Sequence, residues 1–441
     1  MKRDETNAPG SGATRVHADT RGRTGMYRSP KGLSETRPRL MSILVLLLLL
    51  PACDEVLEVE RSPSQIPGDQ IVGESSFRAR YIGAAALFAD AVGVNTVYGG
   101  LFTDELLWSG SFPNRDEIDR RSIDPANDIV ADEPYTALQR AAKVAKDLQR
   151  EMLEGLYPNI VPNPEPSAEL AQVSLFSGYT RLYLADLFCT LAFDGVGPEL
   201  NAQDVYSQAI EDFTRAIDAA EADEQVRNAA LVGRARARMQ RGDFEGALAD
   251  AQQVPVGFEY AVEYSQSTSS NNVWSFTRSN RRLPVSFEFR GLKIDDTEVD
   301  DPRPGTEDIG RPSFSGSDRA WSPRKYADQF APILIASWEE AQFMIAEIQG
   351  GDVARDIINE LRALNGVSIT WDAAGEATDE EILRKVIDEK GRTMLLEGHR
   401  MGDFSRYLTQ YGIDLFPTGE GFGNQTCMPL PNKERHQNPG L

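Results

Sequence analysis

Residues 206–251 read YSQAIEDFTRAIDAAEADEQVRNAALVGRARARMQRGDFEGALADA. The first part of this stretch carries one apolar stripe at helical spacing, formed by Tyr206, Ile210, Phe213 and Ile217. Farther on, Gly242 and Asp243 separate two more helical segments, 229–240 and 244–251. Glycine commonly ends a helix and aspartate commonly caps the next one, so this arrangement predicts a helix-turn-helix unit.

The same unit recurs along the chain. The group Ala209, Ile210 and Asp212 matches Ala247, Leu248 and Asp250 at an offset of 38 residues, close to the period of about 34 in tetratricopeptide repeats. We expect further helices at Tyr81–Leu107, Pro134–Leu153, Val173–Phe193, Leu334–Gln349 and Val353–Leu364. The predicted fold class is therefore all-α dominated, a tetratricopeptide-like solenoid of helical pairs in which Met and aromatic residues at these spacings, Trp338 included, form the core.

Length and composition limit the possible functions. The chain has 441 residues, enough for two or three packed units, and 41% of them are apolar. Its 46 basic against 68 acidic side chains give a net charge of -22, which opposes binding to nucleic-acid backbones. Three cysteines and three histidines leave little material for a zinc cluster. We expect no nucleic acid, metal ion or cofactor.

Residues 1–52 have the features of a secretory leader. The apolar run Ile43–Leu50 follows Arg37 and Arg39 and is too short for a permanent span, which needs about 20 apolar residues. The sequence Leu-Pro-Ala-Cys at 50–53 resembles a bacterial lipobox, although proline at its second position is a departure. We expect lipidation at Cys53 and an acidic, proline-containing tether over residues 53–75. A free Cys53 behind an ordinary signal peptide is the alternative.

The amino-acid composition changes between residues 256 and 330. This segment holds a polar run at 265–272, a candidate strand at Val285–Phe289 and an acidic loop rich in Gly and Pro at Asp295–Arg311. Loops on a rigid scaffold carry binding groups without disturbing a core, so we expect residues 256–330 to be a ligand-binding insertion. It separates a helical repeat region, 76–255, from a C-terminal helical region, 331–441.

A charged motif lies in the C-terminal region. Glu389-x-x-Arg392 is followed by Leu-Leu-Glu-Gly-His-Arg at 395–400, and then by Asp403 and Arg406. These short spacings around a helix end suit ion pairs that fix how the last helix meets the irregular segment after it, a task for which the planar guanidinium is well suited. The motif indicates a structural role, and no catalytic residue is predicted.

In this order the motif resembles that of the SusD/RagB family. Pro-Leu-Pro at 429–431, Glu434 and Asn438-Pro439 continue the likeness, and the lipobox, tether, paired helices and insertion agree with it over the whole chain after the leader. The resemblance implies a nutrient-binding lipoprotein on the outer face of the outer membrane. Such a protein caps a TonB-dependent, SusC-like barrel transporter and passes an oligosaccharide or a peptide into it. The compact chain implies shortened binding loops.

A sugar site needs aromatic platforms with polar groups at their rim. Trp108 is the first candidate because Asp104 and Arg115 lie near it in the sequence, and Trp274, Trp321 and Tyr326 follow from the insertion. The alternative for each tryptophan is that it pins a loop to the scaffold.

Two other function classes remain open. An acidic surface glycosidase needs a pair of carboxylates across a cleft, and no such pair is visible in the sequence. A tetratricopeptide scaffold would bind a protein and no small ligand. Cys189 and Cys427 either pair in an oxidising compartment or remain apart, with Cys189 as a buried free thiol.

Overall fold

The computed structural model describes residues 74–441, apart from 221–222, 267–268 and 373–375. The leader and Cys53 lie outside these residues, so the signal peptide and the lipidation stay predictions. The described residues from 74 onward form one compact unit, where chain length suggested two or three. The division after the tether into regions 76–255, 256–330 and 331–441 stays a prediction.

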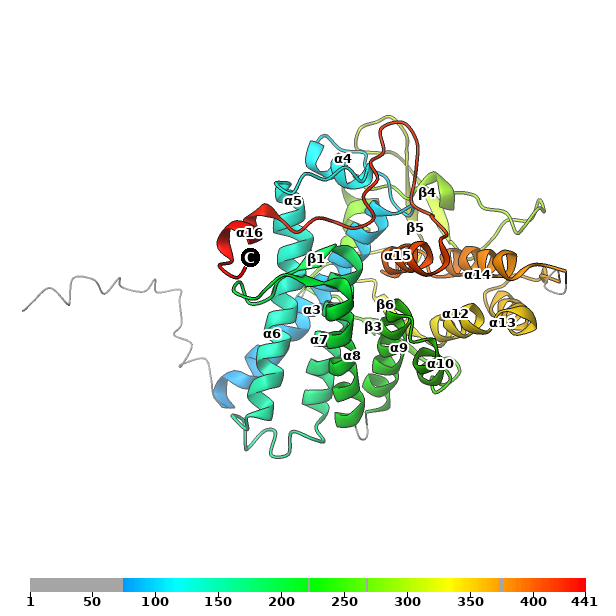
Figure 1. Ribbon diagram of the computed structural model, residues 1–441. Coiled ribbons are helices and arrows are strands. Elements are labelled where there is room, and N and C mark those ends of the chain that lie inside the picture. The colour runs from blue at the N-terminus through cyan, green and yellow to red at the C-terminus, as the bar shows by residue number, and fades with distance from the viewer. Residues whose placement is uncertain (1–73, 221–222, 267–268, 373–375) are drawn as a thin grey trace, which may run out of the picture. The chain divides into compact units, whose positions relative to one another are not determined.

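Helices dominate the first half of the body (Figure 1), as the sequence predicted. They are α3 (Glu74–Phe102), α4 (Pro113–Asp119), α5 (Asp128–Val130), the π-helical turn η2 (Ala131–Tyr135), α6 (Thr136–Leu153), α7 (Ala168–Leu187), α8 (Ala202–Ala219), α9 (Glu224–Arg241) and α10 (Phe244–Ala251). Each helix from α6 to α10 packs against the next one along the chain. This is the solenoid-like packing expected of helical pairs.

The second half combines short strands with helices. Its helical elements are α11 (Asn272–Trp274), the π-helical turn η3 (Ser275–Ser279), the 3-10 turn η4 (Phe287–Phe289), α12 (Trp338–Gln349), α13 (Gly351–Leu364), α14 (Asp379–Thr393), α15 (Arg400–Tyr411) and α16 (Asn432–Gln437). Three antiparallel pairs complete the described part: β1 (Thr190–Leu191) with β2 (Leu200–Asn201), β3 (Glu259–Val262) with β6 (Ile333–Ser337), and β4 (Thr306–Pro312) with β5 (Arg319–Pro323).

The repeat read from the sequence has a physical counterpart. Asp212 on α8 is buried and pairs with Arg181 of α7, and its equivalent Asp250 on α10 is buried and pairs with Arg234 of α9. The second helix of each pair thus uses one buried carboxylate to bind a guanidinium of the preceding helix. A buried carboxylate left alone is costly, so each pair of helices is tied together.

The ring of Phe213 fixes the spacing of three helices. A Cβ atom added to Gly178 of α7 would lie 2.7 Å from this ring, and one added to Gly233 of α9 would lie 2.5 Å from it. Only glycine leaves room for the ring at both places. The helix ends follow the predicted signals, because Gly242 is left-handed with φ of 74° and the Asp243 side chain accepts a hydrogen bond from Gly246 N.

Two local predictions are wrong. The helix expected from Leu334 begins at Trp338, because Ile333–Ser337 is strand β6, paired with β3, and the Ser337 side chain caps α12. The strand expected at Val285–Phe289 is also not formed. Val285 makes a single bridge to Leu106, and the Ser286 side chain then starts a 3-10 turn by accepting from Glu288 N.

Helix α3 is a core helix. Its residues Ser76–Phe102 are long and apolar enough to cross a membrane, but 78% of the apolar window is buried inside the protein. Elsewhere in the described part of the chain no other helix meets that test of length and composition.

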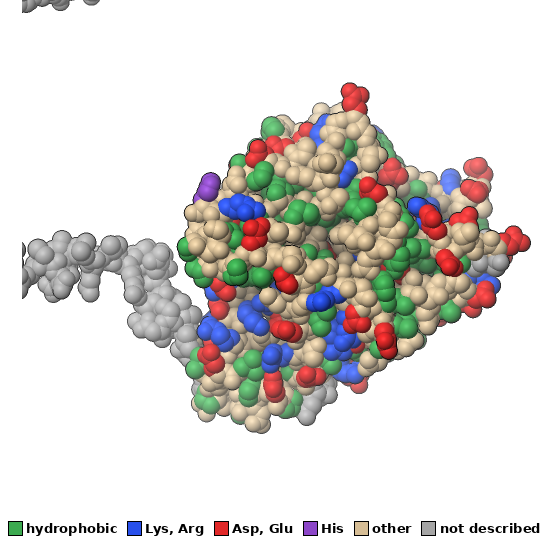
Figure 2. All heavy atoms as spheres, viewed as in Figure 1, with side chains coloured by type: hydrophobic (Ala, Val, Ile, Leu, Met, Phe, Trp, Pro, Cys, Tyr) green, Lys and Arg blue, Asp and Glu red, His purple; other side chains and the backbone are tan. Residues whose placement is uncertain are grey.

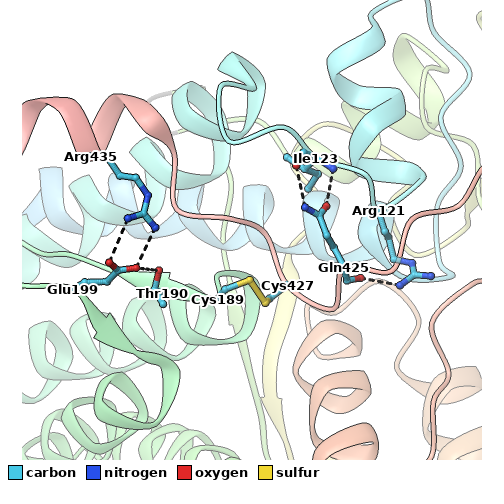
Figure 3. The surroundings of a disulfide bond; sticks show 8 residues. All are labelled: Arg121, Ile123, Cys189, Thr190, Glu199, Gln425, Cys427 and Arg435. Carbon is cyan, nitrogen blue, oxygen red and sulfur yellow. Dashed lines mark hydrogen bonds and ion pairs between the residues drawn. A yellow bond between two sulfur atoms is a disulfide. The ribbon is translucent and has the colours of Figure 1, made fainter. Parts of the chain in front are cut away.

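The C-terminal segment is fastened across the body by a disulfide (Figure 3). Cys427 bonds to Cys189, just after α7, and the backbone runs beside that chain because Met428 N donates to Leu187 O at 2.7 Å. The Gln425 side chain binds both backbone groups of Ile123. Of the two alternatives left open by the sequence, the structure has the paired cysteines.

The predicted ion pairs of the C-terminal motif are present, but most of their partners lie outside the motif. Glu389 on α14 is 1% exposed and accepts from Arg362 Nε of α13 at 3.0 Å, and it also pairs with Arg303 of the insertion. Burial opposes ionisation of Glu389, yet hydrogen bonds from Arg362 and the charge of Arg303 hold its pKa below the usual value.

Two further pairs extend this network. Arg392 binds Asp301 of the insertion at 3.1 Å, and Arg406 of α15 forms two hydrogen bonds with Glu347 of α12 at 2.9 and 2.8 Å. Asp403 bridges Arg406 and Lys390. The motif therefore fastens the insertion and α15 to the helices around them.

We predict that Glu389→Ala lowers the free energy of unfolding by about 3–5 kcal/mol, because it removes one of the two carboxylates that bind each of the buried guanidinium groups of Arg303 and Arg362, the others being Asp301 and Asp295. Urea denaturation measures this change. Glu380→Ala on the same helix, which removes only an exposed pair with Arg384, should change stability by no more than about 0.5 kcal/mol. Equal effects of the two substitutions would contradict the structural role of Glu389.

Candidate functional site

The chain that leaves α3 joins the insertion in one small backbone layer. Leu107 N donates to Pro284 O at 3.0 Å, and Ser109 N donates to Arg282 O at 2.8 Å. On the other side, Val285 N donates to Trp321 O of β5 at 3.0 Å. Segments 106–109 and 282–285 and the hairpin β4–β5 therefore lie side by side, which brings Trp108 next to the insertion (Figure 1).

Four rings and two arginines alternate at one edge of this layer. We call this group the aromatic–arginine cluster; its members are Trp108, Phe112, Arg115, Phe276, Arg282 and Phe314. The Arg115 guanidinium carbon lies 5.7 Å from the Trp108 ring, 5.9 Å from Phe112 and 5.5 Å from Phe276. Arg282 lies 5.5 Å from Phe112 and 4.6 Å from Phe314. Each contact is within the range of a cation–π interaction.

The cluster combines exposed rings with a fixed cation. Phe112 is 48% exposed and Phe314 is 45% exposed, whereas Arg115 is only 7% exposed. Arg115 is held by an ion pair with Glu133 and donates from Nε to the Tyr98 hydroxyl at 3.4 Å. Large exposed aromatic side chains on a soluble body mark a contact surface. Here that surface is preorganised, because its central charge cannot reorient.

A cavity of about 290 Å³ opens beside the cluster. Phe276 and the aliphatic side chains of Leu87, Val94 and Val97 line part of it, and polar side chains line another part: Asp90, Tyr98, Glu133, Arg140 and Asn272. Burial raises the pKa of Asp90, which accepts a hydrogen bond from Asn272. Carboxylate, guanidinium, amide and phenol groups can donate to or accept from hydroxyl groups, so the cavity suits a polar, hydroxylated ligand that stacks on a ring.

The structure brings two of the six predicted ligand-binding residues together, Trp108 and Arg115. Asp104 is bound instead by Arg400 through two hydrogen bonds of 2.8 and 2.6 Å. Tyr326 is 1% exposed and donates its hydroxyl to Leu396 O, which leaves it no open face. Both side chains serve the scaffold in this structure.

The two other tryptophans lie close to the cluster without joining it. Trp274 is half-buried against the core, two residues before Phe276. Trp321 packs near Arg290, at 5.8 Å, and lines a separate cavity of about 370 Å³ together with Phe289 and Leu292. The exposed ring of Phe287 covers Arg290 at 4.2 Å.

Sequence reasoning missed four members of the cluster: Phe112, Phe276, Arg282 and Phe314. Phe112 offered a signal, since it lies between Trp108 and Arg115 in the sequence. The other three reach the cluster only through the contacts of the insertion with segment 106–109, and no local pattern records those contacts.

No group of three or more His, Cys, Asp or Glu side chains in the described ranges is arranged to hold a metal ion. The acidic loop 295–301 is occupied by ion pairs in this structure. Asp295 binds Arg362 and Lys385, and Asp301 binds Arg303 and Arg392.

Glu105 fixes the position of the segment that carries Trp108. Its backbone oxygen accepts from Ser286 N at 2.9 Å, and its carboxyl group accepts from Leu396 N at 2.7 Å. Leu396 has a left-handed φ of 56°, which is strained for a residue with a side chain, so the Glu105 bond helps to hold it. Burial raises the pKa of Glu105 to about 8, although the bond from Leu396 opposes the shift.

The fold is shared with solved structures of one superfamily. A SusD superfamily protein from Bacteroides vulgatus matches with a TM-score of 0.64 and 15% identity, over 84% of this chain and 99% of the other. Surface glycan-binding protein A from Bacteroides thetaiotaomicron, solved with laminarihexaose, matches with a TM-score of 0.63 and 13% identity, over 83% of this chain and 98% of the other. A laminarin-binding SusD-like protein matches with a TM-score of 0.59 and 15% identity, over 84% of this chain and 100% of the other. No protein-family model and no curated protein matches the sequence.

We predict that Glu105→Gln changes how stability depends on pH. A folded-state pKa of about 8, above the ordinary 4.5, means that Glu105 contributes stability below pH 4.5 and that this contribution is lost as pH rises to 8. Glutamine keeps an oxygen for Leu396 N but does not ionise. From pH 5 to 8 the wild type should therefore lose stability relative to the variant, by at most about 1.4 kcal/mol per pH unit. If the free energy of unfolding, measured by urea denaturation, changed equally with pH in the wild type and the variant, this prediction would be contradicted.

Proposed function

The chain has the SusD fold, and from this premise we propose that it is a surface lipoprotein that binds a nutrient oligosaccharide and delivers it to a TonB-dependent, SusC-like transporter. The observation that supports binding is the aromatic–arginine cluster beside a polar cavity. In this proposal the leader, 1–52, directs export, Cys53 carries the lipid, and residues 53–75 tether the body to the outer membrane at the cell surface.

The cluster fits the chemistry of sugars. A pyranose ring presents C–H groups on its faces and hydroxyl groups at its edge. In the proposed site, Trp108, Phe112 and Phe276 provide the stacking surfaces, and Asp90, Asn272 and Arg140 of the cavity bind the hydroxyl groups. Because Arg115 is already fixed by Glu133, this side chain loses little entropy when a ligand binds.

The charges around the site favour an uncharged ligand. Arg115 pairs with Glu133, and Asp132, at the rim of the cavity, pairs with Lys433. The pairs leave little net charge to attract an ionic ligand, and the chain as a whole carries -22, which repels anionic glycans. A neutral oligosaccharide is therefore the proposed ligand, ahead of a peptide. Proteins of this fold that bind laminarin or laminarihexaose support the same class.

The disulfide supports the proposed location. Cys189–Cys427 joins two segments 238 residues apart, and such bonds persist in oxidising compartments outside the cytosol. In the proposed division of roles, segment 103–115, the insertion, 256–330, and the side chains of Asp90 and Arg140 bind the ligand. The rest of the helical region, 76–255, and the C-terminal region, 331–441, hold them in place. The role is binding without turnover.

We predict that Phe276→Ala and Trp108→Ala each weaken oligosaccharide binding at least tenfold, about 1.4 kcal/mol, because each removes a stacking surface. Isothermal titration with a panel of neutral oligosaccharides measures this. Phe287→Ala is the matched control, since Phe287 is 64% exposed and also covers an arginine but lies outside the cluster.

Two results would reject the binding proposal. One is that no oligosaccharide in the panel binds, and the other is that Phe287→Ala weakens binding as much as Phe276→Ala. Release of shorter sugars from a bound glycan would instead support a glycosidase.

For the transport step, we expect a large TonB-dependent barrel to co-purify in near-equal amount when the lipidated protein is isolated from its native membrane in mild detergent at low salt. Recovery of the protein alone would argue against delivery to a transporter. Recovery with a soluble protein partner would favour the tetratricopeptide scaffold.

A further inference from the structure

One end of the body exposes a group of aliphatic side chains. Leu153, at the end of α6, is 37% exposed, and Leu156 and Ile160, in the connection to α7, are 39% and 36% exposed. We call these three residues the aliphatic edge. A single exposed leucine is ordinary, whereas three partly exposed large aliphatic side chains within eight residues are a candidate contact surface.

The connection that carries this edge is held firmly. Tyr157 lies between the exposed residues in the sequence and is fully buried, with its ring 4.8 Å from the ring of Phe77. Its hydroxyl accepts from Arg80 Nη1 at 2.8 Å and donates to Glu151. Leu156 N also donates to Glu151 O at 3.0 Å. The aliphatic side chains are therefore presented to the outside by an ordered support.

The edge lies where the chain enters the body. Phe77 and Arg80 belong to the first two turns of α3, so their contacts with Tyr157 and Glu151 place the edge beside the beginning of that helix (Figure 1). Twenty residues separate Cys53 from Glu74, the first residue of α3. A flexible chain of that length spans about 25 Å on average, and at most about 70 Å when fully extended. An anchor at Cys53 therefore keeps the beginning of α3, on average, nearer the membrane than the far end of the helix.

Most charges next to the edge are paired. Arg80 binds Glu151, Arg150 binds Asp147 at 3.2 Å, and Arg215 binds Glu165 at 2.7 Å. Two exposed side chains of opposite charge, Glu154 within the edge and Arg78 of α3, form no ion pair with the described residues. Basic and acidic side chains are likewise interspersed over the lower part of the face in Figure 2. The whole chain carries -22, yet these pairs bring no net negative charge to the edge. An anionic lipid surface would repel it less than it repels the rest of the body.

We propose that the aliphatic edge rests in the interface of the outer leaflet beside the lipid anchor and orients the body on the membrane. The proposal rests on the proposed lipidation of Cys53. The tether keeps the edge at high local concentration near the bilayer, so that a small apolar contact, too weak to bind a free protein, is enough to select one orientation.

The test uses the lipidated full chain in phosphatidylcholine vesicles that contain an anionic lipid. A Leu156→Cys variant is labelled with an environment-sensitive fluorophore; the three native cysteines are taken by the lipid and the disulfide. Val256→Cys is the control, because Val256 is 79% exposed in the turn after α10, away from the edge. We expect lipids brominated in their acyl chains to quench the Leu156 label severalfold more than the Val256 label. Equal quenching would overturn the proposal.

Vesicle flotation separates this proposal from the one on which it rests. Protein that does not float with the vesicles shows that the lipid anchor is missing, and both proposals then fail. If the protein floats but the label at position 156 is exposed to water, the lipid anchor is present and only the proposed edge contact is overturned. Shielding of the label only when a transporter is added would also overturn it, since the edge would then bind protein. Leu156→Asp should abolish the difference in quenching between a label at Ile160→Cys and the label at Val256→Cys, without reducing flotation.

Discussion

The buried carboxylate of Glu389 is the constraint on which the rest of the body depends. An ionised group taken out of water needs full compensation, and Glu389 receives it from Arg303 of the insertion, Arg362 of α13 and Lys385 of its own helix. None of these segments can move away without exposing or stranding a charge. The insertion has little regular structure of its own, so ion pairs supply much of what fixes it. The ion pairs of the C-terminal motif join the insertion to the surrounding helices, in addition to the apolar contacts through which Val285, Phe289 and Tyr326 of the insertion belong to the core.

The geometry of the proposed binding site depends on these ion pairs. With the insertion held, segment 282–286 can lie against segment 105–109, the ring of Phe276 meets Arg115, and the ring of Phe314 meets Arg282. Glu105 and Leu396 link the same layer back to the C-terminal region. The cluster is thus assembled from three distant parts of the chain, yet its central cation, Arg115, is already paired with Glu133 before any ligand arrives. Such a site loses little entropy on binding, at the cost of depending on contacts far from it.

How much was predictable from the sequence depended on the range of the interactions. Helices α8, α9 and α10 were readable because their stripes, Gly242 and Asp243 act within a few residues. Ile333–Ser337 was misread because a strand is decided by its partner, here Glu259–Val262, more than 70 residues away. In the same way, Trp108 and Arg115 were found because they are neighbours along the chain, whereas Phe276, Arg282 and Phe314 were missed. The burial of Tyr326 and the pairing of Asp104 with Arg400 could not be read from the sequence either, because an aromatic ring or a carboxylate looks the same in a sequence whether it is buried, paired or exposed.

Helix α3 relates the proposed ligand site to the proposed membrane contact. Its 29 residues rise by about 1.5 Å each, so its two ends are about 44 Å apart. Phe77 and Arg80 hold the aliphatic edge at its first turns, and the chain leaving its last turn carries Glu105 and Trp108. A body resting on that edge would therefore hold the aromatic–arginine cluster some tens of ångströms from the edge, where a large glycan can approach without steric hindrance from the bilayer. The apolar core packed around α3 keeps this separation fixed, because bending the helix would break contacts along its whole buried length.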